Sequence, residues 1–181
     1  MKKIKRILIA NRGEIASRII RTCKKMGITS IAVFSEADRN APFVSQADLA
    51  VFIGESSPNE SYLVHEKIIS AAKKTQADAI HPGYGFLSEN VQFARRCREE
   101  GIIFIGPAPE VMDKLGDKVA AKKIARAVNV PLIEDSKKNL ISEDIVLEEA
   151  KRIGFPIMVK AAAGGGGRGM RVVRNAKALV K

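Results

Sequence analysis

The first part of the chain alternates short apolar runs with longer amphipathic stretches, and this alternation constrains the fold more than any other feature. The apolar runs have the length of buried strands, which we expect at residues 5–10, 30–34, 50–53, 77–80 and 102–105. Between them, apolar residues recur at helical spacing, which predicts helices at residues 13–26, 62–74 and 89–100. Such alternation forms a parallel sheet with helices on both faces. The sequence therefore predicts an α/β fold, a Rossmann-like open parallel sheet that ends near Gly106.

The pattern changes after residue 108. We expect helices at residues 110–115, 118–128 and 145–153, and two strands at residues 156–161 and 170–174 with a glycine-rich loop between them. Asn175 is expected to N-cap a further helix. Because that helix would have barely begun where the sequence stops, we expect a truncated second domain. We place the domains at residues 1–115 and 116–181.

Composition limits the classes of protein to which the chain can belong. Its apolar share of 46% and charged share of 28% are typical of a soluble globular protein, and no apolar run approaches the length of a membrane helix. The apolar run at residues 7–10 is too short for the core of a secretion signal. Cys23 and Cys97 lie far apart and outside any CxxC pair, which favours reduced thiols in a cytoplasmic protein.

The net charge of +11 suits a polyanionic partner, such as nucleic acid, an anionic lipid surface or ATP. The basic residues are spread along the chain rather than gathered in one segment. With two tyrosines and no tryptophan, no aromatic platform alternates with the basic clusters. We therefore expect neither a nucleic acid nor a membrane as the partner.

The glycine run between the two expected C-terminal strands is the clearest candidate site. Gly164, Gly166 and Gly169 satisfy G-x-G-x-x-G, but a dinucleotide fingerprint needs a helix next, and the following residues favour a strand. A Walker loop needs a lysine after the glycines, whereas here Lys160 precedes them and Arg168 lies at the tip. Glycines let backbone N–H groups approach phosphate oxygens, and a nearby cation compensates phosphate charge. The pattern favours a phosphate-covering hairpin over a merely flexible surface hairpin.

A second candidate is the tripeptide Gly116-Asp117-Lys118 at the expected start of a helix. Asp117 suits an N-cap position. Lys118 near that start would oppose the helix dipole unless an anion lay nearby. The tripeptide is thus consistent with either a simple helix cap or an anion-binding position.

A third candidate is the segment that follows the strand at residues 77–80, which reads HPGYGFLSEN. Sites in open α/β sheets form beyond the carboxyl ends of strands. Gly83 and Gly85 bracket Tyr84 and predict a tight loop, and Ser88 is an expected N-cap of the next helix. His81 is either a general base or a structural histidine, and the structural role is favoured.

The first strand-to-helix turn carries Arg12 and Glu14 in the segment ANRGEIA. A nucleotide would bind here in a true Rossmann domain. The turn has a single glycine, so we do not predict a dinucleotide site in it.

Four segments, in this order, resemble one known family: ANRGEIASRIIR, HPGYGFLSEN, FIGP followed by GDKVAAK, and KAAAGGGGRGMRVV. Together they resemble biotin carboxylase, the ATP-grasp component of acetyl-CoA, pyruvate and related acyl-CoA carboxylases. The resemblance runs from near residue 4 to the last residue. It implies a pre-ATP-grasp domain followed by the start of an ATP-grasp domain. It also implies the family's reaction, in which ATP and bicarbonate form carboxyphosphate, which carboxylates biotin on a carrier protein.

The resemblance further implies roles for residues on two sides of a site. The ATP-side residues are Lys118, Lys160, Gly164, Gly165, Gly166, Gly167, Arg168 and Gly169. The biotin-side loop comprises His81, Gly83, Tyr84, Gly85 and Glu89, with Tyr84 expected nearest to biotin. The Mg²⁺ ligands, the bicarbonate-binding lysine and the catalytic arginine would lie downstream, leaving no catalytic or metal-ligating residue in this chain. The implied partners are ATP, bicarbonate, the biotin carboxyl carrier protein and a carboxyltransferase subunit, with a homodimer at full length.

The chain departs from the family's usual pattern at two places. Ala162 and Ala163 stand where a serine and a fifth glycine are common, which implies a slightly less flexible loop. Glu134 and Asp135 stand where a proline and a glycine are usual at the hinge of the lid, which leaves the hinge geometry open.

Two other hypotheses stay open at this point. One is another ATP-grasp ligase, similar to carbamoyl-phosphate synthetase, which would share the lid but not the HPGYGFLSEN loop. The other is a non-catalytic α/β fragment that serves as an assembly partner. If the chain is the start of a biotin carboxylase, we expect the 181-residue polypeptide alone not to turn over ATP.

Overall fold

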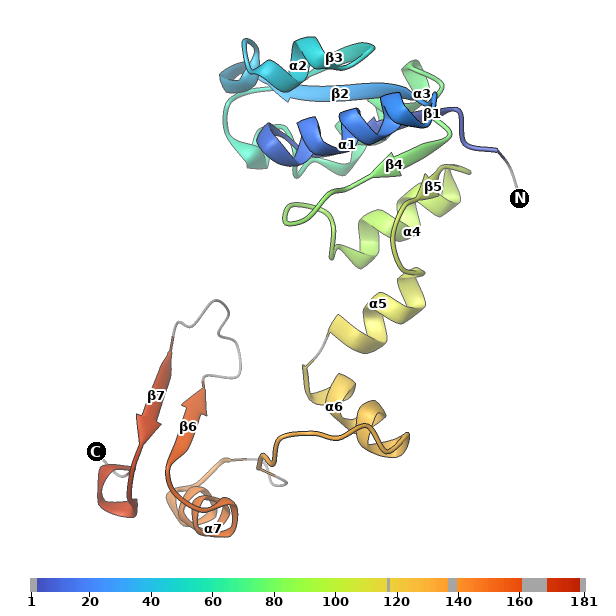
Figure 1. The fold of residues 1–181 in the computed structure, drawn as a ribbon. Helices are drawn as coiled ribbons and strands as arrows, with labels where there is room; N and C mark the ends of the chain where they lie inside the picture. Colours follow the sequence, from blue (N-terminus) through green and yellow to red (C-terminus); the bar gives the residue numbers. More distant parts are fainter. Residues whose placement is uncertain (1–2, 117, 137–139, 161–168, 180–181) are drawn as a thin grey trace. The chain divides into compact units, whose positions relative to one another are not determined.

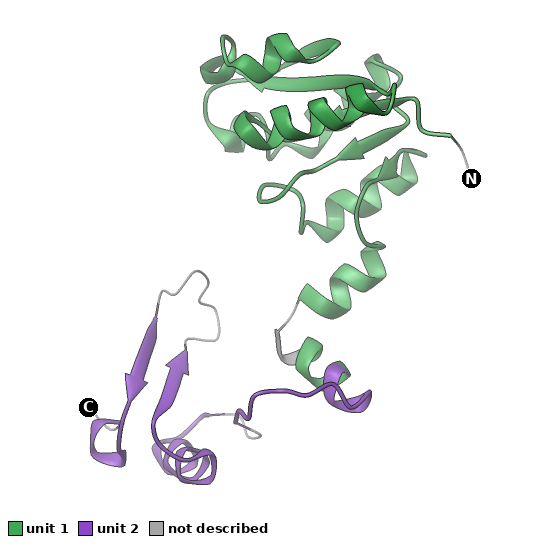
Figure 2. Ribbon diagram, viewed as in Figure 1, with its two compact units in different colours: residues 1–124 green, residues 125–181 purple. Residues whose placement is uncertain are grey.

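A computed structural model of the chain describes residues 3–116, 118–136, 140–160 and 169–179 (Figure 1). The chain divides into two compact units, residues 1–124 and residues 125–181 (Figure 2). None of the helices in the described ranges combines the length and apolarity that a membrane span needs.

The first unit is built on a five-stranded parallel sheet with the strand order β3-β2-β1-β4-β5, which confirms the predicted fold class. The strands are β1 Arg6–Ile9, β2 Thr29–Ser35, β3 Leu49–Gly54, β4 Ala79–His81 and β5 Ile103–Phe104. The chain enters at the central strand β1, proceeds to one edge through β2 and β3, and then crosses to β4 and β5 on the other side (Figure 1). The direction of progression therefore reverses between β1 and β4.

Helices cover both faces of this sheet. They are α1 Gly13–Lys25, α2 Pro42–Gln46, α3 His65–Lys74 and α4 Val91–Glu99. Because successive strand residues face opposite sides, Ile7 and Ile9 of β1 pack with α1 and α2, whereas Leu8 packs with α3 and α4. Two separate apolar clusters result, one on each face of the sheet.

Three local predictions in this unit were wrong. No helix was predicted between the strands at residues 30–34 and 50–53, yet α2 forms there, because Pro42 suits the first helical turn and Phe43 is buried against α1. The helix expected from residue 62 begins at His65, because Tyr62 is buried in a different role, described below. The expected cap Ser88 is replaced by Asn90, whose Oδ1 accepts a hydrogen bond from the backbone N–H of Phe93 at 2.8 Å.

Two short helices follow the sheet. They are α5 Pro109–Gly116 and α6 Lys118–Ala127, and the division between the compact units falls inside α6. Their bounds agree closely with the helices expected at residues 110–115 and 118–128.

The second unit contains α7 Glu143–Ile153 and an antiparallel hairpin of β6 Ile157–Lys160 and β7 Met170–Val173. Gly154 ends α7 as expected. Asn175 caps a short 3-10 helix, Ala176–Ala178, by accepting from the N–H of Ala178 at 3.0 Å, as predicted.

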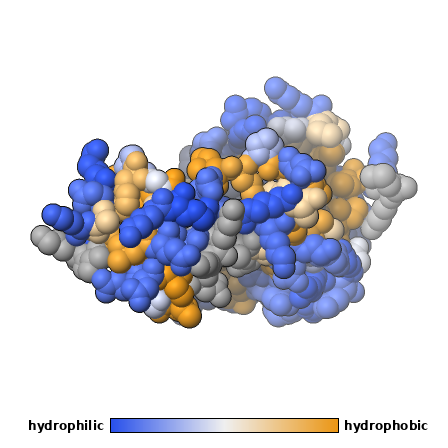
Figure 3. All heavy atoms as spheres, turned by 90° about the horizontal axis from the view of Figure 1, so that it is seen from below, coloured by the Kyte–Doolittle hydropathy of each residue, from blue (hydrophilic) through white to orange (hydrophobic). Residues whose placement is uncertain are grey.

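The described part of this second unit has little core. Glu149, Ala150 and Val173 are its buried residues, while Ile133 and Ile141 are 92% and 84% exposed. Figure 3 shows one face of the whole chain, on which hydrophobic residues lie among hydrophilic ones. Apolar burial is therefore concentrated in the first unit.

We expect residues 1–124 to fold without the rest of the chain. Both apolar clusters consist of residues up to 105, so removal of residues 125–181 deletes no member of either cluster. Urea unfolding of the 1–124 polypeptide, followed by circular dichroism, should give a single cooperative transition. Loss of that transition would show that the sheet depends on residues after 124.

The carboxylate of Asp48 should make the sheet sensitive to acid. Asp48 accepts hydrogen bonds from the backbone N–H of Ser30 at 2.8 Å and from its Oγ at 2.7 Å. These bonds lower the pKa of Asp48 below its ordinary value of 3.8. Because the folded-state pKa is the lower one, the stabilisation is complete above the unfolded pKa and is lost as pH falls through the folded pKa.

Asp48→Asn should therefore reduce the free energy of unfolding at pH 7 by less than about 1 kcal/mol, because solvent screens this exposed carboxylate, and should weaken its dependence on pH below 4. Urea midpoints measured from pH 7 to pH 3 test this. Glu55→Gln, an exposed carboxylate just after β3, is the matched control and should behave like the unsubstituted chain. Equal effects of the two substitutions on the urea midpoints would show that the bonds between Asp48 and Ser30 do not cause the sensitivity to acid.

Candidate functional site

Two loops meet where β1 and β4 end. The strands are parallel neighbours in which Ile9 pairs with His81, and the N–H of Ala10 donates to the carbonyl of His81 at 2.9 Å. Because both strands end at the same edge, residues 10–13 and residues 82–86 lie side by side (Figure 1). This edge is also the point where the strand order reverses, the usual place for a ligand site in an open α/β sheet.

Asn11 joins the two loops. Its side-chain Nδ2 donates to the carbonyl of Pro82 at 2.7 Å and to the carbonyl of Tyr84 at 3.0 Å. Its Oδ1 accepts from the backbone N–H of Arg12 at 3.0 Å. The residue is 1% exposed, and its bond to Pro82 is buried, while the other two bonds are partly buried.

The loop after β4 is as tight as the sequence predicts. Gly83 and Gly85 have φ angles of +67° and +68°, a region that favours glycine. A Cβ on Gly83 would lie 2.7 Å from Nδ2 of Asn11 and 2.7 Å from Cγ2 of Ile15. Gly83 is therefore required both by the backbone and by the close approach of Asn11, while Tyr84 between the glycines is 65% exposed.

His81 is held within this loop. Its Nδ1 accepts from the N–H of Gly83 at 3.0 Å, which assigns the proton of the neutral ring to Nε2. Burial lowers the pKa of His81 below its ordinary value, and the cation of Arg18 lowers it further. This arrangement favours a structural role for His81 over that of a general base.

The other end of the loop rests on Tyr62. The ring of Phe86 stacks on the ring of Tyr62, with centroids 5.1 Å apart and planes inclined by 8°. The Tyr62 hydroxyl donates to Oδ2 of Asp38 at 2.7 Å and accepts from the N–H of Ser35 at 3.3 Å. Burial, with the adjacent Asp38 carboxylate, raises the pKa of Tyr62. The hydroxyl therefore stays protonated and keeps the ring in place.

Asp38 extends this network to the first loop. Its Oδ2 lies 3.3 Å from Nη1 of Arg12 and accepts from Oγ of Ser35 at 3.1 Å. Arg12, noted in the sequence for its position in the first strand-to-helix turn, is thereby linked through Asp38 to Tyr62.

Asn11, Asp38 and Tyr62 were not predicted from the sequence as members of the site. Asn11 carried a usable signal, since an amide directly after a strand at the reversal point is well placed to bond a neighbouring loop. Asp38 and Tyr62 carried none, because they come from a polar loop and from an apparent helix start. Glu89, the last predicted residue of the loop, is exposed beside the cap Asn90.

The predicted ATP-side residues fall partly outside the described residues. Lys160 is the last residue of β6, is exposed, and pairs across the hairpin with Met170. Gly169 precedes β7 directly. The returning strand confirms the predicted hairpin and excludes a dinucleotide fingerprint, which needs a helix there.

Lys118 is the first residue of α6, as the sequence predicted. Five of the ATP-side predictions and the expected cap Asp117 lie outside the described residues; the five are Gly164, Gly165, Gly166, Gly167 and Arg168. Within the described ranges, no group of three or more His, Cys, Asp or Glu side chains is placed to hold a metal ion.

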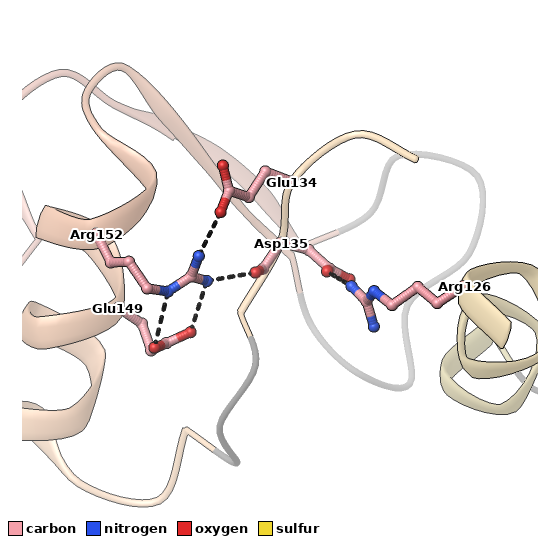
Figure 4. Close-up of polar contacts among 5 residues, drawn as sticks. All are labelled: Arg126, Glu134, Asp135, Glu149 and Arg152. Atoms are coloured by element: carbon pink, nitrogen blue, oxygen red, sulfur yellow. Dashed lines mark hydrogen bonds and ion pairs between the residues drawn. The ribbon is translucent and has the colours of Figure 1, made fainter. Parts of the chain in front are cut away.

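A charged network holds the segment before α7 where the chain departs from the family's usual hinge (Figure 4). Arg152 of α7 donates to Oε1 of Glu134 at 2.5 Å and to the backbone carbonyl of Asp135 at 2.6 Å. It also bonds both carboxylate oxygens of Glu149, at 3.1 and 2.9 Å. Arg126 pairs with the carboxylate of Asp135. Charge-assisted bonds thus hold Glu134 and Asp135, which stand where a proline and a glycine are usual.

Two protein-family models match consecutive parts of the chain. Residues 3–112 match the model described as biotin carboxylase, N-terminal domain. Residues 117–181 match the model described as carbamoyl-phosphate synthase L chain, ATP binding domain.

Individual relatives match almost the whole chain. Biotin carboxylase 2 of Bacillus subtilis is 53% identical over 97% of this chain. A biotin carboxylase complex with "beta-gamma-ATP" from Campylobacter jejuni has a TM-score of 0.91 and 51% identity over 98% of this chain. The biotin carboxylase domain dimer of Hydrogenobacter thermophilus 2-oxoglutarate carboxylase, solved with MgADP, ADP and bicarbonate, has a TM-score of 0.88 and 44% identity over 99% of this chain.

This chain spans 40% of the length of each of these three proteins. The N-terminal family model covers more than half of the chain, and the similarity to the relatives extends through both compact units. The chain therefore belongs to the biotin carboxylase family.

Proposed function

We propose that this chain supplies the biotin-side loop and the phosphate lid of an ATP-dependent biotin carboxylase. The enzyme joins ATP and bicarbonate into carboxyphosphate and carboxylates biotin on a carrier protein. The observation that carries the proposal is the β6–β7 hairpin, in which Lys160 and Gly169 flank the glycine run. It is supported by relatives named biotin carboxylase that match 97% of the chain at 53% identity.

On the ATP side, the proposal assigns the hairpin to the nucleotide phosphates. Backbone N–H groups of Gly164–Gly169 would face phosphate oxygens, and the cations of Lys160, Arg168 and Lys118 would compensate their charge. Support comes from the exposed position of Lys160 at the end of β6 and from the nucleotide named in the Campylobacter jejuni complex.

On the biotin side, the proposal assigns the loop His81, Gly83, Tyr84, Gly85 and Glu89. The loop lies at the sheet edge where the strand order reverses, and Tyr84 offers an exposed aromatic ring there. An aromatic face can pack against the planar ureido group or the aliphatic carbon atoms of the biotin ring system.

The remaining partners follow from the same assignment. Bicarbonate and magnesium are named with the Hydrogenobacter thermophilus relative, which is also described as a dimer. The family resemblance implies magnesium ligands in the part of the relatives that this chain does not span, and we propose them there. A carrier protein, a carboxyltransferase subunit and homodimerisation belong to the full-length enzyme in this proposal.

The proposal also includes the domain division and the location. We place the domains at residues 1–115 and 116–181, supported by family models that match residues 3–112 and 117–181. The compact units divide later, after Ile124 inside α6. A cytoplasmic location is supported by the free, buried thiols of Cys23 and Cys97.

A chimaera tests the activity. Residues 1–181 are joined in frame to the remaining C-terminal part of the Bacillus subtilis relative, whose own N-terminal part they replace. The chimaera should release ADP when bicarbonate is present and should release it faster when free biotin is added, because biotin accepts the carboxyl group of carboxyphosphate and so drives its turnover. The 181-residue chain alone should release no ADP above background.

The intact relative serves as the positive control for this assay. Turnover by the 181-residue chain at the rate of the chimaera would contradict the proposal. Carbamoyl phosphate formation from ammonia without biotin would favour the alternative of a carbamoyl-phosphate synthetase-like ligase, the description carried by the second family model.

The charge of Lys160 should matter for ATP. Lys160→Gln in the chimaera removes the cation but keeps most of the side chain, and should raise KM for ATP about tenfold, a loss of about 1.4 kcal/mol. Lys151→Gln on α7 removes an exposed cation from the same unit and should leave KM for ATP unchanged. Equal KM values for ATP in the two variants would show that the cation of Lys160 does not contribute to ATP binding.

A further inference from the structure

We infer that Asn11 is a positioning residue that holds the Tyr84 loop in its binding conformation. This inference rests on the proposed function for the assignment of the loop to biotin. The contacts of Asn11 itself do not depend on that assignment. Its side-chain amide donates two hydrogen bonds and accepts one.

The amide group of Asn11 spans the first half of the loop. Its single NH₂ group donates to the carbonyls of Pro82 and Tyr84, which flank Gly83. Its oxygen is occupied by the N–H of Arg12, so the amide cannot rotate without losing bonds at both ends. The spacing of the two carbonyls is therefore set by one rigid group.

Other side chains cannot replace this bridge. A carboxylate at position 11 has no donor and would face two carbonyl oxygens in a buried site, which is costly. An alanine removes the donors that Asn11 supplies to both carbonyls. Space is equally restricted on the loop side, because a Cβ on Gly83 would lie 2.7 Å from Nδ2 of Asn11.

The second half of the loop is held independently. Phe86 has a positive φ of 43° and stacks on Tyr62, whose hydroxyl is bonded to Asp38 and Ser35. Tyr84 thus lies between an anchor at Asn11 and an anchor at Tyr62. The two anchors hold the backbone, and because Tyr84 is 65% exposed it stays open to a ligand.

A preformed loop binds more tightly because less ordering is needed when the ligand arrives. Loosening the first anchor should therefore weaken binding at Tyr84 and leave the ATP side unaffected. A purely structural role of Asn11 would instead lower the stability of the whole unit and disturb every segment of it.

Hydrogen exchange on the 181-residue chain measures the loop directly. In Asn11→Ala, peptides covering residues 82–88 should exchange about tenfold faster, while peptides covering β2 keep their rates. Asn59→Ala, at an exposed asparagine, is the matched control and should change neither segment. Asn11→Ser is a milder second variant if the alanine variant does not fold. Unchanged exchange of the loop, or equally faster exchange of all peptides, would overturn the inference.

Steady-state kinetics of the chimaera then tests the positioning role. Asn11→Ala should raise KM for free biotin about tenfold and change KM for ATP less than about twofold. Equal changes in both constants would overturn the inference. If ATP hydrolysis by the unsubstituted chimaera did not respond to biotin, the proposed function and the biotin part of this inference would both be refuted. The exchange rates decide separately whether Asn11 holds the loop.

Discussion

The parallel pairing of β1 with β4 determines where the rest of the candidate site lies. Because Ile9 is opposite His81, the residue that follows Ala10 reaches the carbonyls of the loop that follows His81. A shift of the pairing by one residue would turn Asn11 away from that loop and would exchange the residues on the two faces of the sheet. The two apolar clusters and the Tyr84 loop thus depend on the same strand register.

The two compact units are stabilised by different interactions. The first buries apolar residues on both faces of its sheet, and the bonds of Asn11 and the separate Tyr62–Asp38 pair are built on that base. In the described part of the second unit, few residues are buried and Arg152 is bonded to three acidic residues or their backbone. Glu149 is buried, but Glu134 is exposed, and charge-assisted bonds at exposed positions are weaker than apolar burial and are screened by salt. They orient the segment before α7 without forming a core.

The agreement between the sequence expectations and the fold follows the strength of the local signal. Strands such as β1 and β2 and the long helix α1 have uninterrupted apolar patterns, and they were predicted to within a few residues. The short helix α2 was missed because its five residues contain one buried side chain, Phe43, which is too little for a helical period. Asn90 replaced Ser88 as a cap because the choice between two neighbouring capping residues depends on where α4 packs.

The sequence by itself determined the fold class, the hairpin around the glycine run and the tight turn at Tyr84, because each is encoded in residues that are close together along the chain. Only the tertiary structure decided that Asn11, Asp38 and Tyr62 support the Tyr84 loop. Asn11 lies more than seventy residues before the carbonyls it bonds, and Tyr62 meets Asp38 across 24 residues. Such partners are brought together by strand register and helix packing, and no periodicity within either segment indicates them.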